Sequence, residues 1–375
     1  MKWVETTFGE FVDCNPMIKC KRNCLVENCE MEDIDANFKY LYPQQGKFYT
    51  GSGSKFQNGD TVFSRITPCL ENGKIAQIKG LKGNVGVGST EFFVFRGKAN
   101  VSYNDFVYYL ANSRYIRKSA ENSMAGASGR QRADLNFIKS RTIRVPEKVE
   151  DQKKIASILS HYDDLIEINK RRIALLEESA RELYKEWFVR MRFPNYENVH
   201  FVEGKPEDWD LVNLTDIIEI RYGKDHKALA DGNIPCYGSG GIMRYVESQL
   251  YNGECVLIPR KGTLNNIMWV NGPFWTIDTM FYGIPMKEHV AKLVFFYLSS
   301  LNMEMFNAGA ALPSMTTKIL SKLSFPLPPM DIRNAFENKL GDIFSLVKTL
   351  TKYNELLSLQ RDRLLPRLMS GQLEV

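Results

Sequence analysis

Two long segments of the chain carry apolar residues at alternating spacings of three and four. This spacing is typical of a coiled-coil seam, whereas a helix on the surface of a globular domain carries a broader apolar face. The first seam comprises Ile155, Leu159, Tyr162, Ile166, Asn169, Ile173 and Leu176, and the second comprises Phe336, Leu340, Ile343, Val347, Leu350, Asn354 and Leu357. The second seam repeats the first at a constant offset of 181 residues, so we expect two long helices of equivalent design.

Each predicted helix has one apolar seam and no other evident partner, so the two are expected to pair as an antiparallel coiled coil. Full overlap places Asn169 opposite Asn354 and Ile173 opposite Leu350. Facing Asn side chains would satisfy each other's amide groups and fix the register, whereas an Asn opposite a leucine would leave a buried amide unpaired. The alternative is that one or both Asn side chains point to solvent at the edge of the seam.

Prolines set the expected ends of both helices, because proline has no N–H to donate within a helix. We expect the first helix to end by Pro194 and the second to end at Pro366. The spacing of three and four continues beyond Leu357 as far as Leu368, but an end at Pro366 makes Leu368 doubtful as a seam residue.

The sequences upstream of the helices repeat as well, which indicates a plan of module, helix, module, helix. Residues 60–65 resemble residues 254–260, and residues 90–95 resemble residues 277–282. Both modules contain short β-like runs punctuated by Gly and Asn-Gly turns, together with a helical stretch, which predicts a mixed α/β (α+β) fold. The expected parts are a first module at 1–147, a first helix at 148–193, a second module at 194–328 that begins with a linker at 194–208, and a second helix with a C-terminal tail at 329–375.

The composition is that of an ordinary globular protein. The 375 residues include 44% hydrophobic and 25% charged residues, which suits two or three domains. No run approaches 18 apolar residues, and the first residues lack the apolar stretch of a signal peptide. The seven cysteines, an odd number in a chain without an export signal, are expected to be reduced thiols. These observations predict a cytoplasmic protein without a membrane span.

The net charge of +5 is distributed unevenly. Residues 114–144 contain eight basic residues against two acidic residues, so this window carries more positive charge than the whole chain. A polyanionic partner such as nucleic acid requires a local concentration of this kind, although lysine and arginine are also common on solvated surfaces.

Catalytic, cofactor and metal motifs are not recognisable. The glycine-rich stretches at 51–55 and 238–241 lack the spacing of a phosphate-binding loop and are interpreted as turns. The four histidines are scattered, and the Asn/Asp-Pro-Pro-aromatic motif of an amino-methyltransferase is missing. Four cysteines that could suggest zinc lack the usual Cys-x-x-Cys spacing; they are Cys14, Cys20, Cys24 and Cys29. We therefore predict a non-catalytic protein with no metal site and no cofactor of its own.

Recognition of a partner is then the expected role. Each module has a loop of small and polar residues before its exit strand, at 125–132 and 308–318, and small residues allow a backbone to approach phosphates closely. Arg65 and Arg260 occupy matching places in the two modules, and arginine can bind guanine through two hydrogen bonds. Alternatively, these arginines form local salt bridges and the loops simply lead into helices. The candidate DNA-contacting residues are Arg65, Lys74, Ser128, Arg130, Gln131, Arg132, Lys224, Ser239, Arg260, Lys261, Asn266, Ser314, Thr316, Thr317 and Lys318.

Several motifs, taken together, resemble the specificity subunit of type I restriction-modification enzymes over essentially the whole chain. The resemblance is carried by Val145-Pro146 leading into residues 152–159, by the helix exit at 184–190 and by the closing segment at 364–373. The start of the second helix, at 328–334, departs from the pattern because it lacks the Gln-Lys-Lys character of the first. The two helix ends could therefore contact their partner subunits unequally.

The resemblance implies a non-catalytic DNA-recognition subunit with two target recognition domains, each reading one half of a bipartite sequence in double-stranded DNA. It also implies two methyltransferase subunits as partners, with S-adenosylmethionine, and in some systems restriction/translocase subunits with ATP and Mg. A helix of about 40 residues spans about 60 Å, enough to hold two readers more than one DNA turn apart. The alternatives are a coiled-coil protein-binding scaffold, without salt-dependent DNA affinity, and an enzyme with an unfamiliar site, which would need a pocket of clustered titratable groups.

Overall fold

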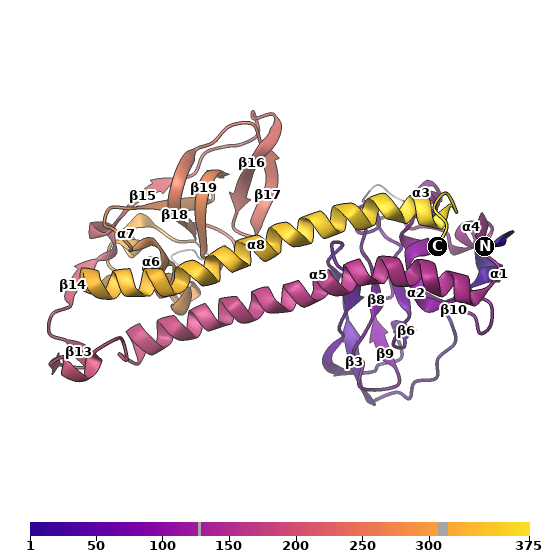
Figure 1. Ribbon diagram of the computed structural model, residues 1–375, viewed down its shortest axis with the longest axis horizontal. Helices are drawn as coiled ribbons and strands as arrows, with labels where there is room; N and C mark the ends of the chain where they lie inside the picture. Colours follow the sequence, from indigo (N-terminus) through magenta and orange to yellow (C-terminus); the bar gives the residue numbers. More distant parts are fainter. Residues whose placement is uncertain (127–128, 307–313) are drawn as a thin grey trace. The chain divides into compact units, whose positions relative to one another are not determined.

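The structure is a computed structural model that describes residues 1–126, 129–306 and 314–375. The chain divides into two units: unit 1 contains residues 1–173 and 348–375, and unit 2 contains residues 174–347. Both units mix helices with sheets, as the sequence predicts (Figure 1). In the described part of the chain, no helix is both long and apolar enough to cross a lipid bilayer.

Unit 1 contains a five-stranded sheet, a four-stranded sheet and one separate strand pair. Its strands are β1 (Trp3–Thr7), β2 (Val12–Cys14), β3 (Leu25–Cys29), β4 (Tyr40–Leu41), β5 (Gln44–Phe48), β6 (Ser54–Phe56), β7 (Thr61–Ser64), β8 (Ile75–Ile78), β9 (Gly86–Gly88), β10 (Phe92–Gly97) and β11 (Thr142–Pro146). Its helices are α1 (Phe8–Phe11), a 3-10 turn (Met31–Asp33), α2 (Asn104–Asn112), α3 (Arg114–Asn122) and α4 (Leu135–Lys139). The larger sheet has the order β2-β10-β7-β8-β4, the smaller one the order β5-β3-β9-β6, and β1 pairs with β11.

The larger sheet of unit 1 is buried on both faces, which explains the unbroken apolar sequence of β10. Alternate residues of a strand point to opposite faces. Phe93 and Phe95 accordingly pack in the core that also contains α1 and α2, whereas Phe92 and Val94 pack in a second core. All four side chains are at most 2% exposed. Burying a side chain of this size contributes about 1.5–3 kcal/mol to the free energy of unfolding. The four side chains of β10 therefore stabilise the sheet that carries the loops described below.

Unit 2 contains one long sheet with the order β15-β20-β18-β19-β16-β17 and two small strand pairs, β12-β13 and β14-β21. The strands are β12 (Phe201–Val202), β13 (Lys205–Pro206), β14 (Asp210–Asn213), β15 (Ile218–Tyr222), β16 (Asp231–Gly238), β17 (Gly241–Val246), β18 (Tyr251–Pro259), β19 (Met268–Thr276), β20 (Met280–Pro285) and β21 (Ser324–Leu327). The helices are α6 (Ala291–Ser300), α7 (Thr317–Leu320) and 3-10 turns at Tyr196–Asn198, Leu214–Asp216 and Met303–Phe306.

The internal repeat read from the sequence is present as equivalent strand pairs. The repeated segments form β7 and β10 in unit 1, and β18 and β20 in unit 2. Each pair is antiparallel, with Phe63 beside Phe93 in the first and Leu257 beside Tyr282 in the second. The two modules therefore share a central strand pair, although the strands added around it differ.

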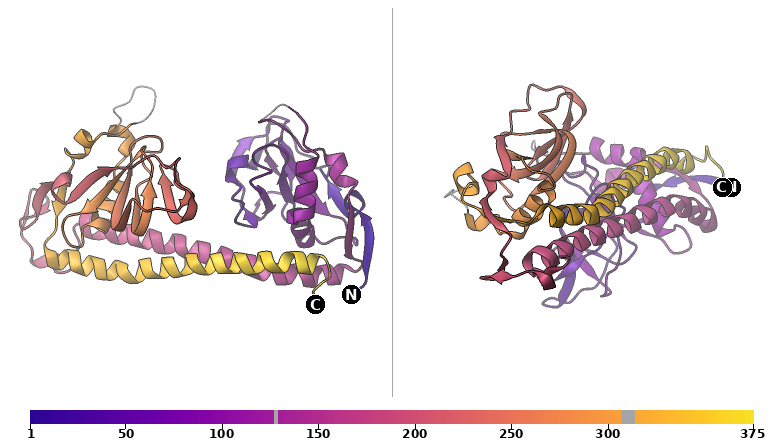
Figure 2. Two further views of the ribbon diagram at one scale, coloured as in Figure 1. Left: turned by 90° about the horizontal axis from the view of Figure 1, so that it is seen from above. Right: turned by 60° about the vertical axis from the view of Figure 1, so that its left-hand side comes forward.

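The two long helices are α5 (Val149–Tyr184), which continues as a π-helical segment (Lys185–Val189), and α8 (Met330–Met369). Within each unit their segments lie side by side and run in opposite directions (Figures 1 and 2). Every residue of the two predicted seams is buried or half-buried. In unit 2, Trp187 packs against Phe336 with a ring-centroid distance of 5.6 Å. This contact agrees with full antiparallel overlap.

The predicted Asn pair is formed in unit 1. Asn169 Nδ2 donates to Asn354 Oδ1 at 2.9 Å, and Asn354 Nδ2 is 3.4 Å from the Ile166 carbonyl oxygen. Asn169 is only 5% exposed, so its amide depends on this partner rather than on water. The alternative, that one or both Asn side chains point to solvent, is wrong, because the two amides bond each other.

The expected end of the second helix at Pro366 is also wrong. α8 continues to Met369 with Pro366 inside it. Leu368 is fully buried, in the same core as Val145 and Ile155. Packing of this last turn on the module outweighs the helical hydrogen bond that proline removes.

Buried charged groups hold each module on the helices. In unit 1, Lys39 Nζ donates to Ser160 Oγ of α5 at 2.8 Å and lies 3.7 Å from the Asp105 carboxylate. Burial lowers the pKa of Lys39, and the nearby carboxylates oppose that effect. One turn further along α5, the Asp163 carboxylate accepts from Arg361 of α8 at 2.5 Å and from the Tyr109 hydroxyl.

Unit 2 uses a single lysine for the same purpose. Lys292 of α6 is 7% exposed, pairs with Glu337 of α8 and lies 3.4 Å from Glu254 of β18. Its ammonium group also sits 4.8 Å from the centre of the Trp269 ring. The module and helix α8 are thereby tied together by charge as well as by apolar packing.

Candidate nucleic-acid interface

In unit 1, two of the predicted arginines converge on one carboxylate. Arg65 directly follows β7, and its Nε lies 3.9 Å from Glu91, just before β10. Arg132 donates to Glu91 from Nε at 3.0 Å and from Nη2 at 2.6 Å. These hydrogen bonds lower the pKa of Glu91, so the carboxylate stays charged near neutral pH. The local salt bridges considered as an alternative are therefore present here.

The loop that contains Arg132 is fastened to the turn after β7. Thr67 N donates to the Gln131 carbonyl at 3.0 Å, and Gln131 N donates to Thr67 Oγ1 at 3.0 Å. Arg130 is exposed at the tip of this loop. Ser128, a further candidate, lies outside the described residues. Lys74, another candidate, donates from its Nζ to the Met31 carbonyl at 2.6 Å.

Unit 2 contains the equivalent arrangement around Arg260. This residue directly follows β18, its N donates to the Thr279 carbonyl at 2.8 Å, and its Nη1 donates to the Asp278 carbonyl at 3.2 Å. The guanidinium also lies 5.4 Å from the centre of the Tyr222 ring, which is 51% exposed. The backbone carbonyl of Arg260 accepts from Met315 N at 2.8 Å. Arg260 is thereby placed where its strand meets the loop that precedes the exit strand.

The backbone contacts of the two arginines match one another. Arg65 N donates to the Glu91 carbonyl at 3.0 Å, and the Arg65 carbonyl accepts from Ala133 N at 2.8 Å. These are the counterparts of the two Arg260 contacts with Thr279 and Met315. The matching places inferred from sequence are therefore the same structural position in two modules.

The remaining candidates of unit 2 lie near Arg260 or on the helix that follows the loop. Lys261 forms a β-bridge with Ser314, and Asn266 Nδ2 donates to the Ser239 carbonyl at 2.8 Å. Thr316 caps α7, with its hydroxyl accepting from Ile319 N at 3.3 Å, and Thr317 and Lys318 form the first turn of that helix. Lys224 is exposed, and its carbonyl accepts from Trp275 Nε1 at 3.0 Å.

Sequence reasoning missed the groups that position these arginines. Glu91, Thr67 and Tyr222 each contact a candidate residue or its loop. The signal for Glu91 was available, because it stands just before a repeated strand at the place that Asp278 and Thr279 occupy in the second module. That these side chains contact DNA stays a prediction.

The four clustered cysteines do not converge on one point. Cys20 and Cys24 have their sulfur atoms 3.6 Å apart, whereas Cys29 is buried in the core of the sheet. Burial raises the pKa of Cys14 to about 12, which disfavours the thiolate that a metal would need. Over residues 1–126, 129–306 and 314–375, no group of three or more His, Cys, Asp or Glu is arranged to hold a metal ion.

Comparison with known proteins agrees with the duplicated plan. Residues 2–178 and 206–361 each match the family model described as the type I restriction modification DNA specificity domain. The chain is 24% identical to the type I restriction enzyme MjaIX specificity subunit of Methanocaldococcus jannaschii, over 91% of this chain and 85% of that protein. It is 35% identical to part of the EcoAI specificity subunit of Escherichia coli, over 27% of this chain and 17% of that protein.

The fold is also similar to that of a solved structure. The S subunit of a type I restriction-modification system from M. genitalium aligns with a TM-score of 0.53 at 17% identity, covering 98% of this chain and 96% of that one. Each of the two matched family domains contains one module, with Arg65 or Arg260, and much of the long helix that follows it. The chain belongs to the family of type I restriction-modification DNA specificity subunits, which recognise DNA and have no catalytic role of their own.

Proposed function

We propose that this chain reads a bipartite sequence in double-stranded DNA, with one half read by each module. The observation that carries the proposal is the equivalent placement of Arg65 and Arg260, each directly after a central strand and each bonded to the loop before the exit strand. A duplicated reader suits a target with two half-sites, as twofold arrangements do in other DNA-binding proteins.

The pairing of Arg132 with Glu91 supports a role in reading bases rather than only in binding phosphates. An arginine side chain has five N–H donors, and the contact with Glu91 uses Nε and Nη2. The donors that remain are one on Nη2 and two on Nη1, and the two parallel N–H groups at the Nη1–Nη2 end suit the two acceptors of guanine in the major groove. Glu91 would hold the guanidinium in one orientation before DNA arrives. Arg130, exposed and on the same loop, is suited to a phosphate or a base edge.

The long helices offer a surface for the other subunits. Outside the seam, Leu165 and Ile168 of α5 are 43% and 53% exposed, and Tyr353, Leu356 and Leu359 of α8 are 47–49% exposed. Their spacing of three places each set along one side of its helix. We propose that two methyltransferase subunits pack helices on these stripes, with restriction/translocase subunits joining in some assemblies. S-adenosylmethionine, ATP and Mg would then be bound by those partners, and the complex would work in the cytoplasm.

The test is modified-base sequencing of DNA from cells that express this chain with the methyltransferase subunit encoded beside it. The expected result is methyladenine at a split, asymmetric motif that disappears when this chain is omitted. Methylation that persists without this chain, or that follows an undivided motif, would overturn the proposal. Absence of any methylation, together with DNA affinity that does not change with salt, would favour the protein-binding scaffold instead.

A further inference from the structure

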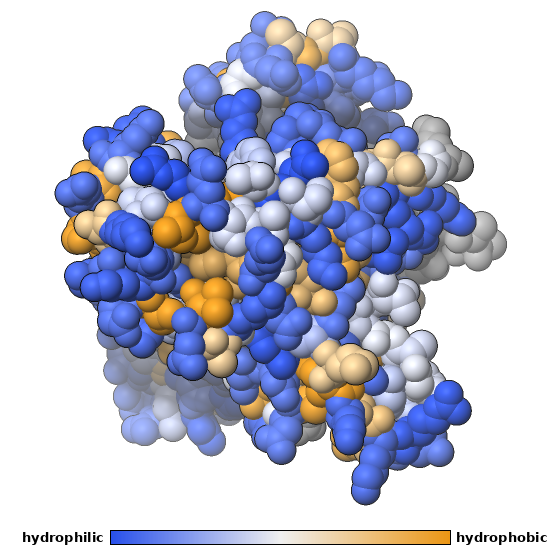
Figure 3. Space-filling model, turned by 90° about the vertical axis from the view of Figure 1, so that its right-hand side faces the viewer, coloured by the Kyte–Doolittle hydropathy of each residue, from blue (hydrophilic) through white to orange (hydrophobic). Residues whose placement is uncertain are grey.

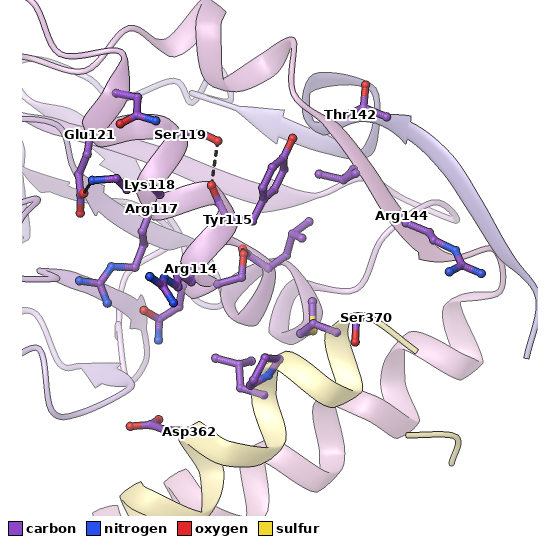
Figure 4. A pocket seen from close by; sticks show the side chains of 18 of the residues that line it. Arg114, Tyr115, Arg117, Lys118, Ser119, Glu121, Thr142, Arg144, Asp362 and Ser370 are labelled. Carbon is purple, nitrogen blue, oxygen red and sulfur yellow. Dashed lines mark hydrogen bonds and ion pairs between the residues drawn. The ribbon is translucent and has the colours of Figure 1, made fainter. Parts of the chain in front are cut away.

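A groove of about 1310 Å³ lies in unit 1, away from the arginine loops described above. Its walls are α3 on one side and the last turns of α8 on the other, with part of β11 at one end (Figure 4). Figure 4 shows Arg114, Arg117 and Lys118 on α3, with Asp362 of α8 and Ser370, which directly follows α8, across from them. The groove takes no part in the contacts that hold Arg65 or Arg132.

The groove carries an excess of positive charge that its own residues do not neutralise. Its lining includes five basic side chains and two acidic ones; they are Arg114, Arg117, Lys118, Arg144 and Arg361, against Glu121 and Asp362. Lys118 pairs with Glu121 at 3.1 Å, and Arg361 pairs with Asp163 and Asp362. Within the part of the chain that the structure describes, Arg114 and Arg117 have no ion pair.

The two unpaired arginines are placed to act together. Residues three apart share one face of a helix, so Arg114 and Arg117 lie beside each other on α3 (Figure 4). Arg117 Nε is buried and has no hydrogen-bond partner in the described residues. Guanidinium groups form charge-assisted, two-point hydrogen bonds with carboxylates, so carboxylates brought to this place would pair with the two arginines.

The floor of the groove is apolar. Leu365 and Met369 of α8 are half-buried in it, Ile143 of β11 is buried beneath it, and Tyr115 at the rim is 53% exposed. The face of the molecule drawn in Figure 3 is largely hydrophilic, with hydrophobic residues gathered in small patches. Pro366 also lies within this wall.

We propose that this groove binds an acidic, amphipathic segment of a partner protein. Carboxylates of the segment would pair with Arg114 and Arg117, while its apolar side chains would cover Leu365 and Met369. A DNA backbone would use the arginines but not the apolar floor, because interfaces with DNA are predominantly polar. The combination of unpaired guanidinium groups with an apolar floor therefore favours a peptide.

The probe is a fluorescein-labelled synthetic peptide of twelve residues, with glutamates on one face of its helix and leucines on the other. Its binding to the full-length chain is measured by fluorescence anisotropy at several salt concentrations. We expect binding that weakens with salt and that falls at least tenfold in the double variant Arg114→Glu, Arg117→Glu. Leu365→Asp should weaken it as well, because it places a charge in the apolar floor.

The matched control is the double variant Lys19→Glu, Lys82→Glu, which changes the net charge by the same amount at exposed positions outside the groove. It should bind the peptide as the unchanged chain does. If the charge-reversed groove variant fails to fold, the test is repeated with the double variant Arg114→Gln, Arg117→Gln, whose folding is checked by circular dichroism. The proposal would be overturned if the unchanged chain does not bind the peptide, or if both charge-reversed chains lose peptide affinity equally. It would also be overturned, in favour of DNA as the ligand, if only the groove variant loses affinity for duplex DNA.

Discussion

Replacing one member of the Asn169–Asn354 pair should destabilise the helical pair, whereas replacing both should not. In Asn354→Leu, the Asn169 amide, only 5% exposed, loses the acceptor that lies 2.9 Å away. A buried polar group left unpaired costs about 1–3 kcal/mol, and removal of both partners in favour of apolar groups can be nearly neutral or stabilising. We therefore expect each single variant to lose about 1–3 kcal/mol and the double variant, Asn169→Leu with Asn354→Leu, to recover most of that loss.

Native-state hydrogen exchange measured by mass spectrometry reports the free energy of local opening for this part of the helices. The peptides to follow span residues 160–173 and 348–360, which belong to unit 1. Asn338→Leu is the control, because Asn338 is exposed on the same helix and its replacement should change stability by no more than about 0.5 kcal/mol. If the double variant loses as much as the two single variants combined, the side chains do not interact and the assigned register is wrong.

Three further predictions concern the modules. First, Arg130→Ala or Arg260→Ala should relax the sequence preference in one half-site and leave the other intact, as read by modified-base sequencing; an equal loss in both halves would indicate a phosphate contact. Second, hydrogen bonds from Arg132 hold the pKa of Glu91 below its usual value. These bonds therefore stabilise the loop at pH values above the pKa that Glu91 has in the unfolded chain, and the stabilisation is lost as the pH falls through its pKa in the folded chain. Hydrogen exchange of the loop should accelerate over that acidic range in the natural chain, and Glu91→Gln should abolish the pH dependence. Third, Arg361→Met leaves the buried Asp163 carboxylate without its ion-pair partner and should destabilise unit 1 by about 3–5 kcal/mol in urea unfolding. Adding Asp163→Leu to this variant should restore much of the lost stability. An Arg361→Met variant as stable as the natural chain would contradict this reasoning.

The helices and their register were predictable because a seam is a local, periodic signal. A spacing of three and four determines which side of a helix is apolar, and a polar residue in each seam then selects one alignment. The strand repeat was predictable for a similar reason, since the segments that form β7 and β18 are apolar on both faces. In these cases a few neighbouring residues determine the outcome.

The error at the end of the second helix arose because distant residues decide the outcome there. Pro366 is a helix breaker by its local chemistry, but Leu368 is buried in the core of a module whose residues lie more than 200 positions earlier in the chain. Contacts between distant residues could not be predicted around the candidate site either. The Lys74 ammonium group donates to the Met31 carbonyl, and the pairing of Arg132 with Glu91 depends on a fold that brings residues 41 positions apart together.

Unit 1 is assembled from two segments that unit 2 separates in the sequence, and this has a consequence for synthesis on the ribosome. Unit 2 is one continuous segment, residues 174–347, and all of it is synthesised before residues 348–375. Leu368 and Arg361, which complete the core and the buried ion pair of unit 1, are therefore synthesised after the whole of unit 2. Domains generally fold as units during translation. The module translated first should therefore finish folding last, and a chain truncated before Arg361 would have an intact unit 2 beside an unfinished unit 1.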